Sequence, residues 1–188
     1  MQDVEILLGI GNIGAKFVGT RHNVGFVITK KFVEKHNVIA EKKFENAKVW
    51  ECEFLDKKIV VCHPTTYVNN SGVAARELFA FYGVTEEKLL VVVDDINLKL
   101  ATMRFRKNGS AGGHNGLRSL IDHTSQDFAR LRFGVGPLPE NEVIIEFVLG
   151  RFSKEEEEIA NEKIDLAVEA LDCYFENGIV AAMNKYSS

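Results

Sequence analysis

The stretch VEILLGIGNIG, residues 4–14, joins a short apolar run to three glycines in the spacing G-x-G-x-x-G. A continuous apolar run that ends in a glycine turn is typical of a buried strand in an α/β protein. Glycine permits positive φ angles and close approach of other groups, so loops of this kind are shaped around something. We therefore expect a strand at residues 4–9 and a structured loop directly after it.

The same spacing invites a second interpretation, a dinucleotide-dependent oxidoreductase. In dinucleotide-binding folds a helix follows the glycines and points its N-terminus at the pyrophosphate. Here residues 15–23 contain Gly19 and His22 instead of an immediate apolar helix, and residues 38–42 do not resemble a second strand that ends in a ribose-binding acid. Dinucleotide binding is therefore the weaker interpretation.

Strand and helix patterns alternate along the rest of the chain. Further strands are predicted at 48–54, 58–62, 89–93, 102–106 and 129–135, and helices at about 24–33 after Asn23 as a cap, 71–82, 116–121 and 153–177. The tight turn between 54 and 58 makes two of the strands antiparallel. The pattern predicts a single α/β domain, residues 1–188, whose mixed, twisted sheet has helices on both faces.

The last predicted helix begins with a capping box formed by Ser153 and Glu156. Its expected core face consists of Ile159, Ala160, Ile164, Ala167, Val168, Leu171 and Phe175. Its other face is acidic. The helix is expected to close the core, with a role as a lid as the alternative.

Charge is unevenly distributed along the 188 residues, although 27 acids and 23 bases give only −4 overall. Residues 99–132 hold seven bases and two acids, a net +5, whereas residues 140–172 hold eleven acids and three bases, a net −8. The total argues against indiscriminate binding of polyanions, and the basic segment marks where one nucleic acid could bind.

The chain shows no sign of a membrane or secreted protein. Its longest apolar runs, 89–93 and 143–145, are far shorter than a membrane span, and its first residues do not begin a signal peptide. Cys52, Cys62 and Cys173 are odd in number and have no metal-ligand spacing, which indicates reduced thiols in a cytoplasmic protein. Nothing in the pattern demands a partner subunit, so we expect a monomer.

Polar side chains recur at predicted strand ends and in glycine-rich loops. They are Asn12, His22-Asn23, Asn69-Asn70, Asp94-Asp95 and His114-Asn115. Each alone could be a cap or a turn residue, but strand ends of α/β sheets meet at the ligand crevice. The other histidines, His36, His63 and His123, are expected to be packed or on the surface.

This set of side chains suits hydrolysis by an activated water. A neutral histidine can take a proton from water while a carboxylate fixes its tautomer, and asparagine amides can position a peptide and an oxyanion. The sequence lacks G-x-S-x-G, H-E-x-x-H and C-x-x-C, so it offers neither a serine nucleophile elbow nor a metal motif. We therefore expect no cofactor and no metal.

Five further segments carry a family resemblance when taken with residues 9–14. They are 20–26 (TRHNVGF), 64–72 (PTTYVNNSG), 94–98 (DDINL), 109–117 (GSAGGHNGL) and 147–150 (FVLG). In order and spacing the chain resembles bacterial-type peptidyl-tRNA hydrolase over essentially its whole length. The resemblance implies hydrolysis of the ester between a peptide and the terminal ribose of tRNA, which recycles the tRNA.

The resemblance also implies roles for individual residues. His22 corresponds to the general base, Asp94 to the carboxylate that orients it, and Asn12 to the asparagine near the oxyanion. The positions that match substrate-binding residues are Phe17, Asn69, His114 and Asn115, and those that match tRNA-phosphate contacts are Arg106, Lys107 and Arg132.

The chain departs from the family pattern in several places. Ile13 replaces a proline, Phe17 replaces a tyrosine, Val68 replaces a methionine, and Lys99-Leu100 replaces a proline-containing turn. Phe17 lacks the hydroxyl that could hydrogen-bond substrate. None of these changes touches His22 or Asp94, so activity is expected. The alternative is an RNA-binding protein of the same fold that does not need catalysis, as in a chloroplast splicing factor of this superfamily.

Overall fold

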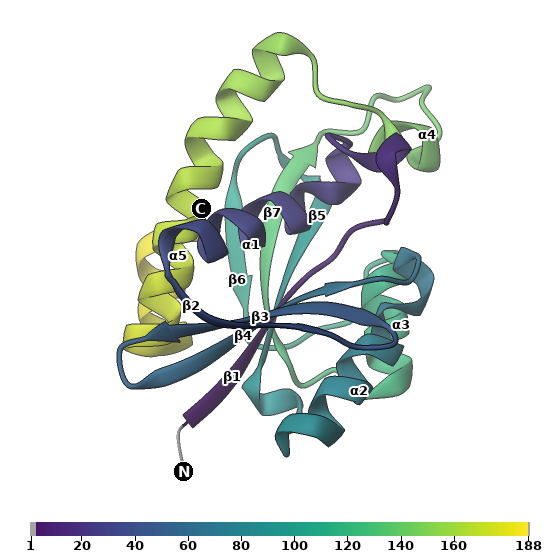
Figure 1. The fold of residues 1–188 in the computed structure, drawn as a ribbon. Helices are drawn as coiled ribbons and strands as arrows, with labels where there is room; N and C mark the ends of the chain where they lie inside the picture. The colour runs from purple at the N-terminus through teal and green to yellow at the C-terminus, as the bar shows by residue number, and fades with distance from the viewer. Residues whose placement is uncertain (1–2, 188) are drawn as a thin grey trace.

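The computed structural model describes residues 3–187. Across that range a seven-stranded sheet in the order β2-β3-β4-β1-β5-β7-β6 has helices on both faces (Figure 1). The strands are β1 (Asp3–Gly9), β2 (Asn37–Lys43), β3 (Ala47–Phe54), β4 (Lys57–Pro64), β5 (Leu89–Lys99), β6 (Met103–Arg106) and β7 (Ala129–Gly136). The α-helices are α1 (Val24–Lys35), α2 (Ser71–Tyr82), α3 (Asn115–His123), α4 (Ile144–Leu149) and α5 (Lys154–Tyr186). The predicted mixed α/β class is confirmed.

The sheet is parallel at its centre and antiparallel at its edges. Strand β1 pairs in parallel with β4 and β5, and β5 pairs in parallel with β7, while β2-β3-β4 and β6-β7 are antiparallel. Strand β5 is buried on both faces, which explains its unbroken apolar start, residues 89–93. The carboxyl ends of the parallel strands meet at one edge, and this edge carries the site.

Helices α1 and α5 cover one face of the sheet, and α2 and α3 cover the other. The first core includes Phe32 and Phe175, and the second includes Leu78 and Leu120. Most of the predicted core face of α5 is buried, but Ile159 is 50% exposed, so its assignment to the core was wrong. The helix turns that residue to solvent one position before buried Ala160.

Helix α1 crosses the sheet closely because Gly25 faces it. A Cβ at Gly25 would lie 2.5 Å from the carbonyl oxygens of Ile10 and Val92, and one at Gly11 would lie 2.7 Å from the ring of Phe26. These glycines therefore serve helix packing. The 9–14 motif leads into a short 3₁₀ turn, η1 (Ala15–Phe17), so no helix N-terminus follows the glycines as dinucleotide binding requires.

Several element boundaries differ from the prediction. Strand β2 was not predicted. It is an exposed edge strand, so its sequence has no alternation of apolar and polar residues to indicate it. Strand β5 does not end at residue 93 but continues through Asp94 and Asp95 to Lys99, with an irregular register beyond Asp95.

Helices also extend beyond the predicted ranges. Helix α5 continues past Asn177 to Tyr186 across a break at Gly178, whose φ of 81° is non-helical. Helix α4 was not predicted, since its six residues are too few to show periodicity. Within residues 3–187 no helix has both the length and the apolar character needed to cross a membrane.

Candidate active site

A cavity of about 580 Å³ opens at the carboxyl edge of the parallel strands. Its lining comes from strands β5 and β7, from the segments after β1 and β4, from the start of α3 and the loop before it, and from α4. It brings together seven of the residues singled out from the sequence, namely Asn12, His22, Asn69, Asp94, His114, Asn115 and Arg132. Phe17, Arg106 and Lys107 are not part of the lining.

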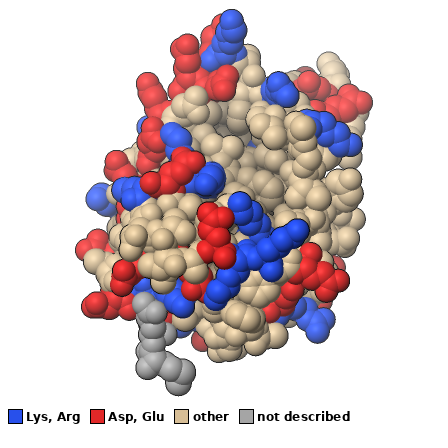
Figure 2. Space-filling view, in the orientation of Figure 1, with Lys and Arg blue, Asp and Glu red and all other residues tan. Residues whose placement is uncertain are grey.

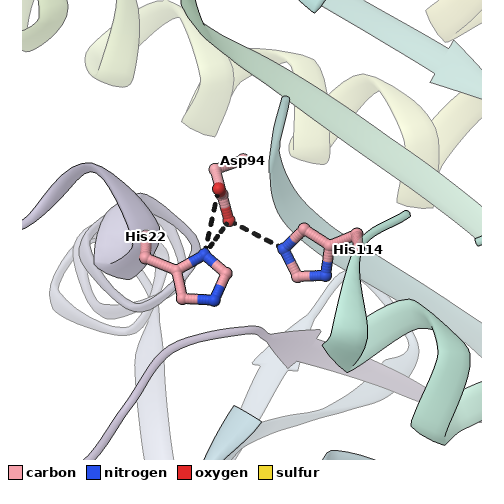
Figure 3. A group of neighbouring side chains, drawn as sticks. All are labelled: His22, Asp94 and His114. Carbon is pink, nitrogen blue, oxygen red and sulfur yellow. Dashed lines mark hydrogen bonds and ion pairs between the residues drawn. The ribbon is translucent and has the colours of Figure 1, made fainter. Parts of the chain in front are cut away.

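His22 and Asp94 form the hydrogen-bonded pair that the sequence suggested (Figure 3). Nδ1 of His22, on the 3₁₀ turn η2 (Arg21–Asn23), lies 2.9 Å and 3.0 Å from the two carboxylate oxygens of buried Asp94. Burial alone would lower the pKa of His22, but the charge and hydrogen bond of Asp94 raise it above its usual value. Within residues 3–187 no hydrogen bond occupies Nε2, which leaves it as the basic nitrogen.

His114 approaches Asp94 from the other side (Figure 3). Its Nε2 lies 3.0 Å from Oδ1 of Asp94, and its Nδ1 accepts the backbone N–H groups of Gly116 and Leu117 at the start of α3. A nitrogen that accepts two N–H bonds carries no proton, so the proton lies on Nε2 and is donated to Asp94. The resemblance implied a substrate-binding role for His114, which stays a prediction. Its bond to Asp94 and its capping of α3 were not predicted, because a histidine cap is not a common helix signal.

The two imidazoles act together on Asp94. Burial would raise the pKa of this carboxyl, but the electrostatic attraction of the His114 and His22 imidazoles and the hydrogen bonds from them hold it well below its ordinary value. Asp94 is therefore a stable anion at neutral pH.

The ligand atoms of these three side chains all lie within 4.8 Å of one another, which is close enough to hold a metal ion. A metal on Nε2 of His114 would require the ring proton to lie on Nδ1. That nitrogen already accepts two backbone N–H groups. The hydrogen bonds therefore favour protons, rather than a metal ion, between the imidazoles and the carboxylate.

Asn12 presents a hydrogen-bond donor to the cavity. Its Oδ1 accepts the backbone N–H of Val68 at 3.0 Å, and this donor fixes which end of the amide is oxygen. The amide nitrogen of Asn12 therefore points away from Val68 and is the donor that remains for the cavity. Asn23 holds this loop by accepting the Asn12 N–H and donating to the Asn12 carbonyl. Asn23 therefore does not cap α1 with its side chain, contrary to the prediction.

Asn69 and Asn115 complete the polar lining. Asn69 lies on the 3₁₀ turn η3 (Val68–Asn70), and Asn115 is the first residue of α3. Both side chains are exposed at the cavity, whereas the intervening wall residue Val68 is buried. Asparagine amides in this position can bond both the carbonyl and the N–H of a peptide.

The geometry agrees with the comparisons with known proteins, because a model of the family described as peptidyl-tRNA hydrolase matches residues 6–188. The chain belongs to the peptidyl-tRNA hydrolase family. It is 42% identical to a peptidyl-tRNA hydrolase of Fervidobacterium nodosum over 97% of this chain and 96% of that protein. It is 38% identical to one of Lachnospira eligens over 97% and 98%.

A solved structure supports the same family assignment. The peptidyl-tRNA hydrolase of Acinetobacter baumannii superimposes with a TM-score of 0.92, at 27% identity, over 100% of this chain and 96% of that one. The resemblance inferred from the motifs is thus confirmed, and the chain is an enzyme of the peptidyl-tRNA hydrolase type.

Two departures from the peptidyl-tRNA hydrolase pattern lie beside the site rather than at its chemistry. Phe17 packs edge-on against Tyr67, with ring centroids 6.4 Å apart, and Nζ of Lys16 lies over the Phe17 ring, 4.7 Å from its centroid. Its substrate contact stays a prediction. Val68 lines the cavity, so the valine in place of the family's methionine changes the cavity wall.

Arg132 lies in the wall of the peptidyl-tRNA hydrolase cavity, and its side chain is 29% exposed. Its Nη2 is 2.6 Å from Oδ2 of Asp95, which is buried. Successive strand residues face opposite sides of the sheet, so Asp94 and Asp95 contact different partners. One aspartate is held by two histidines and the next by an arginine.

Arginines gather on one face of the β6-β7 hairpin. Arg104 lies opposite Arg132, and Arg106 lies opposite Arg130. Arg130 is buried and donates to the carbonyls at residues 110 and 126; burial and the charge of Arg132 lower its pKa to about 10. Lys107 follows at the end of β6 and is exposed. The basic face of this hairpin therefore consists of Arg104, Arg106, Lys107 and Arg132, while Arg130 is buried.

Most of the acidic segment lies on α5, although residues 143–149 of the segment include part of the cavity wall. Figure 2 shows acidic side chains along the first half of α5, the light-green helix of Figure 1. The buried face of α5 packs on the sheet core with Ala160, Ile164 and Phe175. This packing agrees with the expected role of α5 in closing the core.

An apolar wall of the cavity was missed from the sequence. Val143, Ile144 and Ile145 line the cavity and are 56%, 55% and 61% exposed. The only sequence signal for this wall is the apolar run of residues 143–145 itself, which is too short to indicate a particular structure. Its place beside His22 depends on the position of α4.

The remaining histidines are packed, as expected. His63 stacks on Phe26 and hydrogen-bonds to Thr29, and burial lowers its pKa to about 3. His36 bonds to Asp172 on α5. Both hold helices in place and lie outside the cavity lining.

Proposed function

We propose that this chain hydrolyses the ester bond between a peptide and the terminal ribose of tRNA, with His22 as the base. Nε2 of His22 takes a proton from water, and the water oxygen attacks the ester carbonyl carbon. The bond to the ribose oxygen then breaks, and the proton passes to the released hydroxyl. Asp94 keeps the proton on Nδ1 and stabilises the imidazolium.

The asparagines supply the other half of the proposed chemistry. The amide nitrogen of Asn12 donates to the developing oxyanion, since its oxygen is already bonded to Val68. Asn69 and Asn115 hold the peptide and place the water. The observation that carries this proposal is an unoccupied basic nitrogen on His22 in the same cavity as the fixed donor of Asn12.

The tRNA is proposed to bind on the basic face of the β6-β7 hairpin through Arg106, Lys107 and Arg132. Phosphate contacts of this kind position a nucleic acid without reading its sequence. This suits an enzyme that recycles many different tRNAs in translation. No metal or cofactor has a role in the proposed mechanism.

We also propose a monomeric, cytoplasmic protein in which residues 1–188 fold as one domain. Three free cysteines, two of them buried, support a reducing compartment. Sedimentation and thermal unfolding would test the rest of this proposal. A dimer mass, or two separate transitions, would contradict it.

The test of function uses N-acetyl-aminoacyl-tRNA and unblocked aminoacyl-tRNA with the purified protein in a chelating buffer. Rapid cleavage of the blocked ester alone supports the proposal. Binding of tRNA without cleavage would favour the RNA-binding alternative, and cleavage only after metal addition would contradict the metal-free mechanism.

A further inference from the structure

Arg21 immediately precedes His22, yet the proposed chemistry does not use it. Its side chain is 12% exposed. Nη1 donates to the carbonyl of Arg151 at 2.8 Å, and Nη2 lies 2.7 Å from Oε2 of Glu156. Burying an arginine side chain is costly unless it is paired and hydrogen-bonded, so these contacts fix its position.

Aromatic rings complete the surroundings of Arg21. Its guanidinium carbon lies 4.5 Å from the ring centroid of Phe147 and 5.3 Å from that of Phe152. Nη1 also reaches the Phe147 carbonyl at 3.4 Å. The side chain therefore contacts the end of α4, the segment after it and the start of α5.

The backbone makes the same connection. The N–H of Arg21 donates to the carbonyl of Gly150 at 3.0 Å, and Thr20 forms an antiparallel bridge with Arg151. Side chain and main chain thus fasten η2 to the junction between α4 and α5.

Glu156 is also fixed by a second contact, independent of Arg21. The same Oε2 accepts the backbone N–H of Ser153 at 2.8 Å in the capping box of α5. The capping box thus orients the carboxylate of Glu156, and Arg21 pairs with a carboxylate whose position is already fixed. The pair links two parts of the chain separated by 135 residues.

These contacts join the base to the α4 wall of the cavity. His22 follows Arg21 on η2, while Ile144, Ile145 and Val148 of α4 line the wall. We propose that Arg21 is a positioning residue for the hydrolysis: it fixes His22 relative to the α4 wall. This inference rests on the proposed function.

The test compares Arg21→Met with Arg21→Lys and with a matched control, Arg76→Met, on the exposed face of α2. Met keeps the apolar stem but removes every polar contact, whereas Lys keeps the charge and one donor direction. Well below the unfolding temperature, Arg21→Met should lower kcat at least tenfold. Arg21→Lys should recover part of the loss, and Arg76→Met should match the wild type.

A second readout does not depend on activity. The proton between Nδ1 of His22 and Asp94 should give a downfield NMR resonance in the wild type and in Arg76→Met. It should broaden or shift in Arg21→Met. Normal kcat, KM and resonance in folded Arg21→Met, with only a lower Tm, would overturn the positioning role.

The two proposals fail in different ways. If the wild type does not cleave the blocked ester, the proposed function fails, and the resonance still decides whether Arg21 positions His22. If the wild type cleaves and Arg21→Met does so equally well, only the positioning role fails.

Discussion

His22 and His114 hydrogen-bond to the same oxygen of Asp94, at 2.9 Å and 3.0 Å, but only one of them can act as a base. The other nitrogen of His114 accepts two backbone N–H groups of α3, whereas Nε2 of His22 lies in the cavity without a partner among residues 3–187. The hydrogen-bond partners, rather than the residue types, separate the two roles.

Replacing His22 by Ala should remove most hydrolysis. Loss of a general base costs on the order of 100-fold to 10,000-fold in rate. Binding of tRNA should persist, because the basic face of the β6-β7 hairpin is unchanged. The measurement is single-turnover cleavage together with a filter-binding titration. Near-normal turnover would contradict the assignment of the base.

Asp94→Asn should lower the rate and move its pH dependence. Burial alone lowers the pKa of His22, and the charge of Asp94 raises it above the usual value. Without that charge the pKa falls, so the acid limb of kcat/KM should move to lower pH while the plateau rate drops. A pH profile for both proteins tests this. An acid limb that stays in place or moves upward would argue against the pair.

The variants His114→Asn and His114→Ala should distinguish the two roles of His114, its hydrogen bond to Asp94 and its capping of α3. Asn can still cap α3, while Ala should cost about 1 kcal/mol of unfolding free energy. Both variants lose the donor to Asp94, so both should lower kcat and move the acid limb to higher pH, because the less hydrogen-bonded carboxylate holds the His22 proton more tightly.

The controls for this pair are unfolding curves recorded alongside the kinetics. Only His114→Ala should show the lower stability. If His114→Asn kept the full wild-type rate and pH profile, the contact between His114 and Asp94 would have no part in catalysis.

Arg106→Ala should raise KM for tRNA substrates while sparing a minimal peptidyl-nucleotide ester, and should reduce the salt slope of binding by about one. Arg132→Ala should raise KM similarly. It should also lower stability, because Asp95 loses its partner in a buried position. Equal losses on both substrates would contradict the division between tRNA and ester surfaces.

Gly25→Ala should destabilise the fold by about 1–3 kcal/mol, since the added Cβ would lie 2.5 Å from two carbonyl oxygens. Helix α1 must then move away from β1 and β5, and η2 with His22 lies at its start. Chemical denaturation measures the effect. A wild-type midpoint would show that the helix has room to shift.

Local patterns in the sequence predicted much of the fold. The apolar run of β5, the hairpin of β3 and β4 and the capping box at Ser153 all depend on neighbouring residues, so they could be inferred. Strand β2 and helix α4 could not, because an exposed edge strand and a six-residue helix leave weak patterns. The family resemblance located His22 and Asp94 and named Arg106 and Arg132, but neither the resemblance nor the charge count showed that Arg132 pairs with Asp95 or that Arg130 is buried.

The sequence by itself determined the α/β class, the polar residues of the site and the family. Only the tertiary structure decided how those residues are used. His22 meets Asp94 across 72 residues and Arg21 meets Glu156 across 135, so no local pattern encodes either contact. Tautomers, amide orientations and ion-pair partners depend on groups that tertiary packing brings together. That packing results from many weak contacts along the whole chain.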